Sequence, residues 1–147
     1  MDHEVIHSWY DQYKNGIFRY ALSILKDPYL AEDVLHDTFV KLLSGETPRN
    51  PATAQAWLYR VARNLCFDQL RKSKREQPHT RLPSESADRF AYIDMISSLS
   101  LRDQEIITLK IVGGLTHREI SAVLGITEKA AQKRYQRAME VLRDQEG

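Results

Sequence analysis

The sequence predicts an all-α protein made of two small helical domains that are joined by a flexible linker. Apolar side chains recur every three or four residues through most of the chain, which is the period of an amphipathic helix. Asp27-Pro28 and Asn50-Pro51 each place a capping side chain before a proline, a combination typical of helix starts. The stretch from Glu76 to Ser86 is rich in proline and hydroxyl residues and has little that can pack, so it indicates a linker.

These features set the expected domain boundaries. We expect a first domain at residues 1–76, a linker at 77–88 and a second domain at 89–147. A chain of 147 residues can form two such units, each with a modest core. The single cysteine, Cys66, excludes an internal disulfide framework, and no apolar run is long enough for a signal peptide or a membrane span. We therefore expect a cytoplasmic protein without direct membrane insertion.

Two helices are expected before residue 45. The first, from Val5 to Leu25, carries a dense aromatic and apolar stripe that indicates core, and Gly16 weakens it without ending it. The second begins at Asp27-Pro28 and runs to about Leu43 with an acidic outer face. An acidic face repels DNA, so this one either binds a protein or is simply solvated.

The third expected helix starts at Asn50-Pro51, reaches about Arg75 and carries a basic stripe. The stripe recurs at three and four residues and contains one aromatic ring; its members are Arg60, Arg63, Asn64, Phe67, Arg71, Lys74 and Arg75. Cations neutralise phosphates and a ring stacks on an unpaired base, so the stripe suits strand-separated DNA. A solvated basic face with Phe67 turned inward is the alternative.

The second domain is expected to be a bundle of four helices. A short helix spans Phe90 to Leu99, and Ser100 caps another from Leu101 to Val112, where Gly113-Gly114 stops it. Apolar side chains available for burial in that helix are Ile106, Ile107, Leu109 and Ile111.

A helix-turn-helix pattern completes the chain. Thr116 and Glu119 have capping-box spacing, and a short helix from there should stop at Gly125. Thr127 then caps a second helix, whose inner face holds Ala131, Tyr135, Ala138 and Leu142. Its other face carries side chains that reach phosphates and base edges, namely Lys129, Gln132, Lys133, Gln136 and Arg137. The stretch is either a DNA-binding module or an ordinary helical hairpin with a charged face.

The distribution of charge suggests two kinds of partner. The formal net charge is only +1, but acids outnumber bases from Met1 to Thr47, and bases outnumber acids from Gln55 to Arg81. No glycine-rich phosphate loop, nucleophile triad or metal-spaced His/Cys cluster is present, so we expect no catalytic residue, no metal and no cofactor. Cys66 is interpreted as a small buried residue rather than a redox sensor.

The order of three segments resembles the extracytoplasmic-function (group 4) sigma factors of bacterial RNA polymerase, within the sigma-70 family. The similarity runs from about Phe18 to Arg143, and its segments are YLAEDVLHDTFVKL, AWLYRVARNLCFDQLRKSKR and LSLRDQEIITLKIVGGLTHREISAVLGITEKAAQKRYQRAMEVLR. The resemblance implies a region 2-like domain, a region 4-like domain and a protein that is not an enzyme. Such a protein binds core RNA polymerase and directs promoter-specific transcription initiation.

The resemblance also implies roles for individual residues. The helix that matches region 2.2 would dock on the coiled coil of the polymerase β′ subunit, with Asp33, His36, Asp37 and Phe39 as candidate contacts. The segment like regions 2.3 and 2.4 would recognise and open the minus-ten element through Arg60, Arg63, Asn64, Arg71 and Lys72, with Arg49 and Asn50 as candidates around a flipped base. The region 4-like helix would contact the minus-thirty-five element through Lys129, Gln132, Lys133, Arg134 and Arg137, with His117 and Arg118 on the adjacent backbone.

Partners follow from the same resemblance. They are core RNA polymerase, through its β′ coiled coil and its β subunit, promoter DNA, and an anti-sigma factor. His36 stands where the family usually has glutamine, and Ala130, Ala131 and Tyr135 replace residues common in its recognition helix, so no promoter sequence can be transferred. Two alternatives are a helix-turn-helix regulator that acts without polymerase docking and a polymerase-binding adaptor that does not open promoters.

Overall fold

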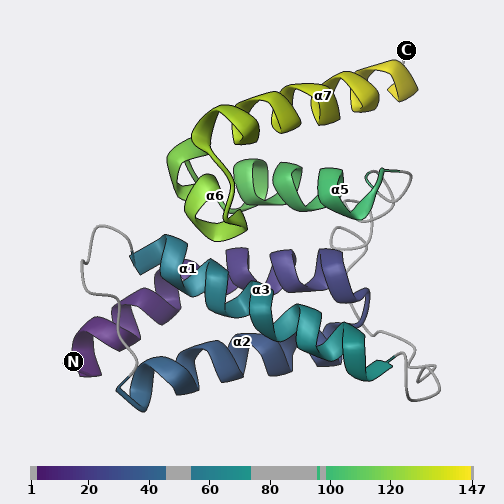
Figure 1. Ribbon diagram of the computed structural model, residues 1–147. Helices are drawn as coiled ribbons and strands as arrows, with labels where there is room; N and C mark the ends of the chain where they lie inside the picture. The colour runs from purple at the N-terminus through teal and green to yellow at the C-terminus, as the bar shows by residue number, and fades with distance from the viewer. Residues whose placement is uncertain (1–2, 46–53, 74–95, 97–98, 147) are drawn as a thin grey trace.

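The protein folds as two layers of helices (Figure 1). The computed structural model describes residues 3–45, 54–73, 96 and 99–146, and within these ranges the regular structure is entirely helical, as predicted. The lower layer in Figure 1 contains α1 (His3–Leu25), α2 (Pro28–Leu43) and α3 (Ala54–Ser73). The upper layer contains α5 (Leu101–Ile107), the π-helical turn η2 (Thr108–Val112), α6 (His117–Leu124) and α7 (Glu128–Glu146).

The junction between α1 and α2 forms where the sequence predicted it. α1 continues through Gly16 and ends at Leu25, and Lys26 takes a left-handed conformation with φ 58°. The Asp27 carboxylate then accepts hydrogen bonds from the backbone N–H groups of Tyr29, at 2.8 Å, and Leu30, at 3.3 Å. These bonds satisfy amide donors that have no partner within the helix, and they fix the start of α2.

The predicted start of α3 at Asn50-Pro51 lies outside the described residues, as do Arg49 and the predicted linker at 77–88. Within its described range, α3 buries Leu58, Ala62 and Cys66 along one face. Most of the helix expected from Phe90 to Leu99 also lies outside the described residues. Ile96 and Leu99 are described, and both are buried.

The helix predicted from Leu101 to Val112 has a different second half. Ser100 caps α5 as expected, but after Ile107 the chain widens into the π-helical turn η2. A π-helical turn carries more residues than an α-helical one and rotates the side chains that follow it. Ile111, expected to be available for burial, lies in this turn and is 52% exposed.

The helix-turn-helix prediction is confirmed in detail. The Thr116 hydroxyl accepts from the Glu119 N–H at 3.1 Å, and the Glu119 carboxylate accepts from the Thr116 N–H at 3.0 Å, which completes the capping box. Gly125 ends α6 with φ 70°, a conformation that costs glycine little. The Thr127 hydroxyl then caps α7 by accepting from the Ala130 N–H at 3.1 Å.

The two layers share one hydrophobic core. Ile17 of α1 and Leu58 of α3 are fully buried in the same cluster as Ile106, Leu109 and Leu115 from the upper layer. α3 packs on α6, and α1 packs on α5 and η2. The sequence left the arrangement of the two parts open, and in the structure they are closed against one another. The boundary at residues 77–88 stays a prediction.

Candidate functional site

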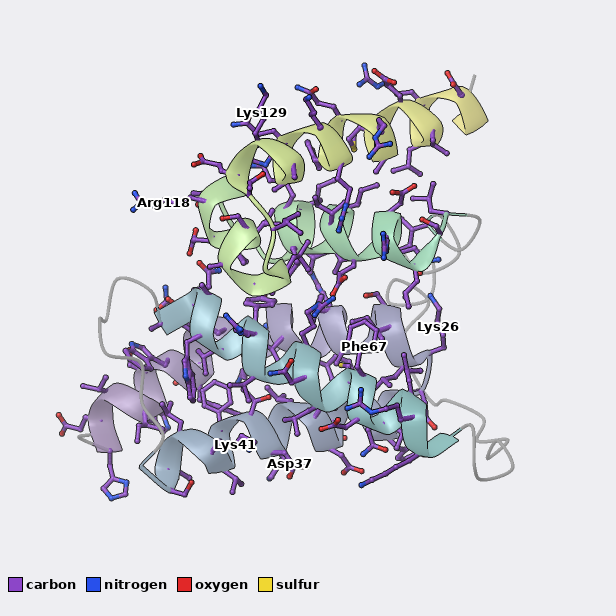
Figure 2. The ribbon with its side chains drawn as sticks, in the orientation of Figure 1. Lys26, Asp37, Lys41, Phe67, Arg118 and Lys129 are labelled. Carbon is purple, nitrogen blue, oxygen red and sulfur yellow. The ribbon has the colours of Figure 1, made fainter. Side chains whose placement is uncertain are left out.

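The candidate site has three surfaces, of which the first is the acidic face of α2. Asp33, His36 and Asp37 are exposed, and Figure 2 shows Asp37 on the side of α2 that faces away from the upper layer. Phe39 is only 5% exposed and packs edge-on against Tyr10, with their ring centroids 5.1 Å apart. Phe39 therefore supports this face from beneath, while the three polar residues form its surface.

An apolar groove that sequence reasoning missed lies between α1 and α2. It has a volume of about 440 Å³, and its lining includes Ile6, Tyr10, Phe39, Val40 and Leu43. Val40 and Leu43 are 51% and 55% exposed. Their apolar character at positions outside the core stripe was the signal in the sequence. Because His36 also lines the groove, the apolar and the acidic surfaces of α2 are continuous.

The second surface is the basic face of α3. Arg60, Asn64, Arg71 and Lys72 are exposed, and Arg63 is partly buried. A cavity of about 400 Å³ is lined by Arg63, Asn64, Phe67, Asp68 and Arg71. The Arg63 guanidinium lies 4.7 Å from the centre of the Phe67 ring, and Arg71 pairs with Asp68. The structure thus brings the predicted cations and the aromatic ring together on one side of α3.

Arg63 also has a partner that the sequence did not reveal. Its Nε donates to the Glu105 carboxylate of α5 at 2.6 Å, and the Tyr20 hydroxyl of α1 donates to the same oxygen at 2.6 Å. Glu105 is 3% exposed, so this carboxylate is buried between the layers. Burial, with the Glu105 charge as the second cause, raises the pKa of Tyr20 well above its usual range and that of Cys66 to about 12.

Further polar contacts cross from the lower layer to the upper one. The Gln55 side chain donates to the Gly113 carbonyl at 2.8 Å, and Arg60 donates to the Ala122 carbonyl at 3.4 Å. The Lys26 ammonium donates to the Gln104 side chain at 2.9 Å, and Figure 2 shows Lys26 reaching from the lower layer toward the upper one. Of the predicted minus-ten residues within the described chain, Arg60 and Arg63 therefore bond to the upper layer, whereas Arg71 pairs with Asp68 of its own helix.

The third surface is the outer face of α7 with the start of α6. Its exposed side chains are Arg118, Lys129, Gln132, Lys133 and Arg137, while Arg134 is partly buried. Figure 2 shows Arg118 and Lys129 projecting outward from the upper layer. This face is separate from the acidic face of α2, which lies in the lower layer.

His117 is only partly exposed, although its predicted role is to contact the DNA backbone. Its ring packs against Tyr135 with the centroids 5.6 Å apart, and its buried Nδ1 has no hydrogen-bond partner among the described residues. Burial, together with the positive charge of Lys110, lowers the pKa of His117. The side chain therefore favours the neutral form, which holds a phosphate less strongly than a cation does.

Two family models match the chain. Sigma-70 region 2 matches residues 9–76, and Sigma-70, region 4 matches residues 89–142. These matches cover most of the sequence in the order that the resemblance required.

The chain belongs to the extracytoplasmic-function group of the sigma-70 family.

Curated relatives and solved structures agree with this assignment. This sigma factor is 29% identical to the sigma factor SigM of Bacillus subtilis, with 81% of each chain covered. It is also 29% identical to SigL of Mycobacterium tuberculosis, over 91% of this chain and 84% of that one. A structure of CnrH in complex with the cytosolic domain of CnrY superposes with a TM-score of 0.73 at 25% identity, covering 97% and 88% of the two chains. RpoE of Bartonella quintana, with a TM-score of 0.67 at 23% identity over 93% and 95%, shows the same fold.

The assignment confirms the predicted family, its two-part helical fold and its non-enzymatic role in promoter-directed transcription initiation. Within the described part of this sigma factor, no group of His, Cys, Asp and Glu side chains is placed to hold a metal ion. None of the described helices combines the length and apolar character that a membrane crossing requires. The roles of individual residues remain predictions.

Proposed function

We propose that this sigma factor divides its work among three helices. α2 docks on core RNA polymerase, α3 holds the opened minus-ten strand, and α7 contacts the minus-thirty-five element. The observation that supports this division best is the open pocket of about 400 Å³ on α3, whose lining combines two arginines and an aromatic ring with Asn64 and Asp68. A helix-turn-helix regulator that binds only duplex DNA has no need of such a cavity.

The docking surface on α2 is proposed to take the coiled coil of the β′ subunit. Asp33 and Asp37 offer charge to basic side chains, and the adjoining groove accepts apolar ones. A surface that combines exposed apolar area with a charged border is typical of a protein interface. The same proposal includes contact between this sigma factor and the β subunit of the polymerase.

The minus-ten surface is proposed to bind single-stranded DNA. Phe67 provides a ring for stacking, and Asn64 provides hydrogen bonds to a base edge. Arg71 and Lys72 are exposed at the end of α3 and neutralise phosphates. Arg49 and Asn50, which lie outside the described residues, stay candidates for the pocket of a flipped base.

The minus-thirty-five surface is proposed to enter the major groove with α7. Lys129, Gln132 and Lys133 are exposed near the N-terminus of this helix, as a recognition helix requires. Arg134 and Arg137 extend the basic surface, and Arg118 is placed to contact the adjacent backbone. His117 has the weaker claim, because its ring packs against Tyr135.

An anti-sigma factor is proposed as a regulatory partner. RpoE of Bartonella quintana, which has the same fold, is seen in complex with the anti-sigma factor NepR, so a chain of this fold can be bound by such a partner. An inhibitor of this sigma factor would compete with core polymerase. Adding it to a preformed complex should therefore release the sigma factor in proportion to its concentration.

The proposal is tested with purified protein, bacterial core RNA polymerase and a library of duplex DNA with randomised promoter elements. We expect the chain to bind core, to enrich one class of sequence, and to make thymines near the start site reactive to permanganate. Core alone should show none of these effects.

Each alternative gives a different result in the same experiment. A regulator that never meets polymerase would select a symmetric duplex site without core. An adaptor would bind core and leave every thymine unreactive. Failure to bind core would exclude both the sigma factor and the adaptor.

A further inference from the structure

We propose that the closed packing of the two layers is an autoinhibited state, in which Glu105 holds Arg63 and must release it before α3 can hold DNA. This inference rests on the proposed use of α3 for the minus-ten strand. It adds a resting state that is built into the chain itself and requires no second protein.

The first argument is that Arg63 belongs to two sites at once. Its guanidinium lines the cavity on α3 over the ring of Phe67, and its Nε is bound to the Glu105 carboxylate. A phosphate placed in that cavity would meet Arg63 already neutralised. It would also approach the negative charge of Glu105, which repels it.

The second argument is the strength of the contact. Glu105 is 3% exposed and accepts hydrogen bonds from both Arg63 and Tyr20, so its charge is compensated inside the protein. Leaving either partner buried and unpaired is costly, because a desolvated charge loses water without gaining a replacement. The contact therefore persists until the layers separate far enough to hydrate Glu105.

The third argument is that the contact is part of a continuous interface. Arg60 bonds to the Ala122 carbonyl of α6, so a second predicted DNA contact faces the upper layer. Near this point a side-chain carbon added at Gly113 would lie 3.1 Å from the Tyr59 hydroxyl of α3. The backbone of the upper layer thus approaches α3 closely. At Tyr59 and Arg63 this side of α3 is covered by the upper layer, and a DNA strand that contacts Arg63 needs it uncovered.

Cys66 gives the chain an internal reporter of opening. It is the only cysteine in the sequence, it is completely buried, and it lies three residues, about one helical turn, after Arg63 on α3. Separation of the layers hydrates this part of α3. The rate at which N-ethylmaleimide modifies Cys66 in the folded protein should therefore follow the fraction of open molecules.

The first experiment compares modification rates at one pH. Glu105→Gln removes the charge that holds Arg63, and Lys26→Met removes the hydrogen bond to Gln104 at the edge of the interface. Asp144→Asn, on an exposed site of α7, removes a carboxylate charge elsewhere. Glu105→Gln also removes a charge that raises the pKa of the Cys66 thiol, so its faster modification counts as opening only if Lys26→Met, which keeps Glu105, is faster as well. We expect Glu105→Gln to be modified about tenfold faster than the original protein, Lys26→Met to be faster by a smaller factor, and Asp144→Asn to be unchanged. Circular dichroism checks that each variant is folded. If Glu105→Gln does not fold, the rate at which Cys66 is modified in Lys26→Met tests the inference alone.

The second experiment measures DNA binding in the absence of polymerase. The probe is a fluorescent single-stranded oligonucleotide of mixed sequence, followed by anisotropy. Glu105→Gln should bind about tenfold more tightly than the original protein, and Asp144→Asn should bind equally.

Two results would overturn the inference. Unchanged modification rates in both Glu105→Gln and Lys26→Met would show that these contacts do not keep the layers closed. Faster modification without tighter DNA binding would show that closure does not inhibit. Core-dependent initiation by the original protein is measured alongside: if it fails, the proposed function is wrong, and if it succeeds while the variants behave as the original does, only the autoinhibition is wrong.

Discussion

At the scale of single residues, Arg63 and Arg71 separate two roles that sequence alone assigned together. They lie about two turns apart on α3. Arg63 is bound to a buried carboxylate, whereas Arg71 pairs with the exposed Asp68. An exposed pair contributes little to stability, so Arg71 is available for a phosphate at little cost.

Arg71→Ala should therefore weaken DNA binding without changing the fold or the affinity for core polymerase. If Arg71 meets one phosphate of a single strand, the slope of log affinity against log salt should fall in magnitude by about 0.7. Anisotropy titrations at several salt concentrations measure this slope, and Asp144→Asn serves as the control. An unchanged slope would remove Arg71 from the DNA surface. Combining Arg71→Ala with Arg63→Ala should impair promoter opening further and still leave core binding intact.

Cys66 predicts a specific dependence on pH. Burial raises the pKa of its thiol from the ordinary 9.0 to about 12. The reactive thiolate is therefore scarce in the folded chain, and its alkylation rate should keep rising above pH 9 without a plateau. The same chain in urea should level off near pH 9. By linkage, the stability that comes from burying the thiol is complete below pH 9 and is lost as the pH rises toward 12.

The interpretation of Cys66 as a small buried residue is confirmed, and the reason it could be predicted is local. It follows Leu65 on the apolar side of a helix whose period was clear. The partner of Arg63 could not be predicted in the same way. Glu105 lies 42 positions away and follows Asp103 in a charged stretch, so nothing nearby distinguishes it from a surface acid. Only the packing of α5 on α1 reveals it.

At the scale of helices, the ends were predictable because each is fixed by a few adjacent side chains. Asp27, Ser100, Thr116 and Thr127 all cap the helices that the sequence assigned to them. The π-helical turn after Ile107 was not predictable, because its residues have ordinary helical character. Its shape depends on backbone bonds such as that from the Gly113 N–H to the Thr108 carbonyl at 3.0 Å.

The capping box of α6 gives a prediction at this scale. Thr116→Ala removes the hydroxyl that accepts from the Glu119 N–H and should destabilise the protein by about 1 kcal/mol. Urea unfolding measures the loss. Ser121→Ala, inside the same helix, should cost less, because alanine favours helix interiors. Equal losses would mean that the cap contributes nothing.

At the scale of the whole molecule, the shared core predicts a single unfolding transition. Ile17 and Leu58 of the lower layer are buried with Ile106 and Leu109 of the upper one, so neither layer keeps its core when the other unfolds. Both tryptophans, Trp9 and Trp57, lie in the lower layer. Tryptophan fluorescence and circular dichroism should therefore give coincident melting curves, and curves that separate would indicate two independent domains.

The arrangement of the layers was the part of the fold that sequence reasoning left open. An apolar stripe on a helix has the same sequence period whether the helix packs within its own layer or against the other layer. The stripe of α1 therefore did not reveal that α1 also packs against η2 of the upper layer. The polar bonds that cross the interface join residues far apart in sequence, such as Gln55 and Gly113. Neither kind of contact leaves a local pattern.

Gly113 is a feature of this arrangement that can be looked for in the sequences of related chains. An added methyl group would press on the Leu109 carbonyl and the Leu115 side chain, each 2.8 Å away, and on the Tyr59 hydroxyl. A related chain with a bulky residue here must shift the turn between Leu109 and Leu115 or move the facing tyrosine of α3. Glycine at this position together with tyrosine on the facing helix is therefore the sequence combination that permits this close approach of the two layers.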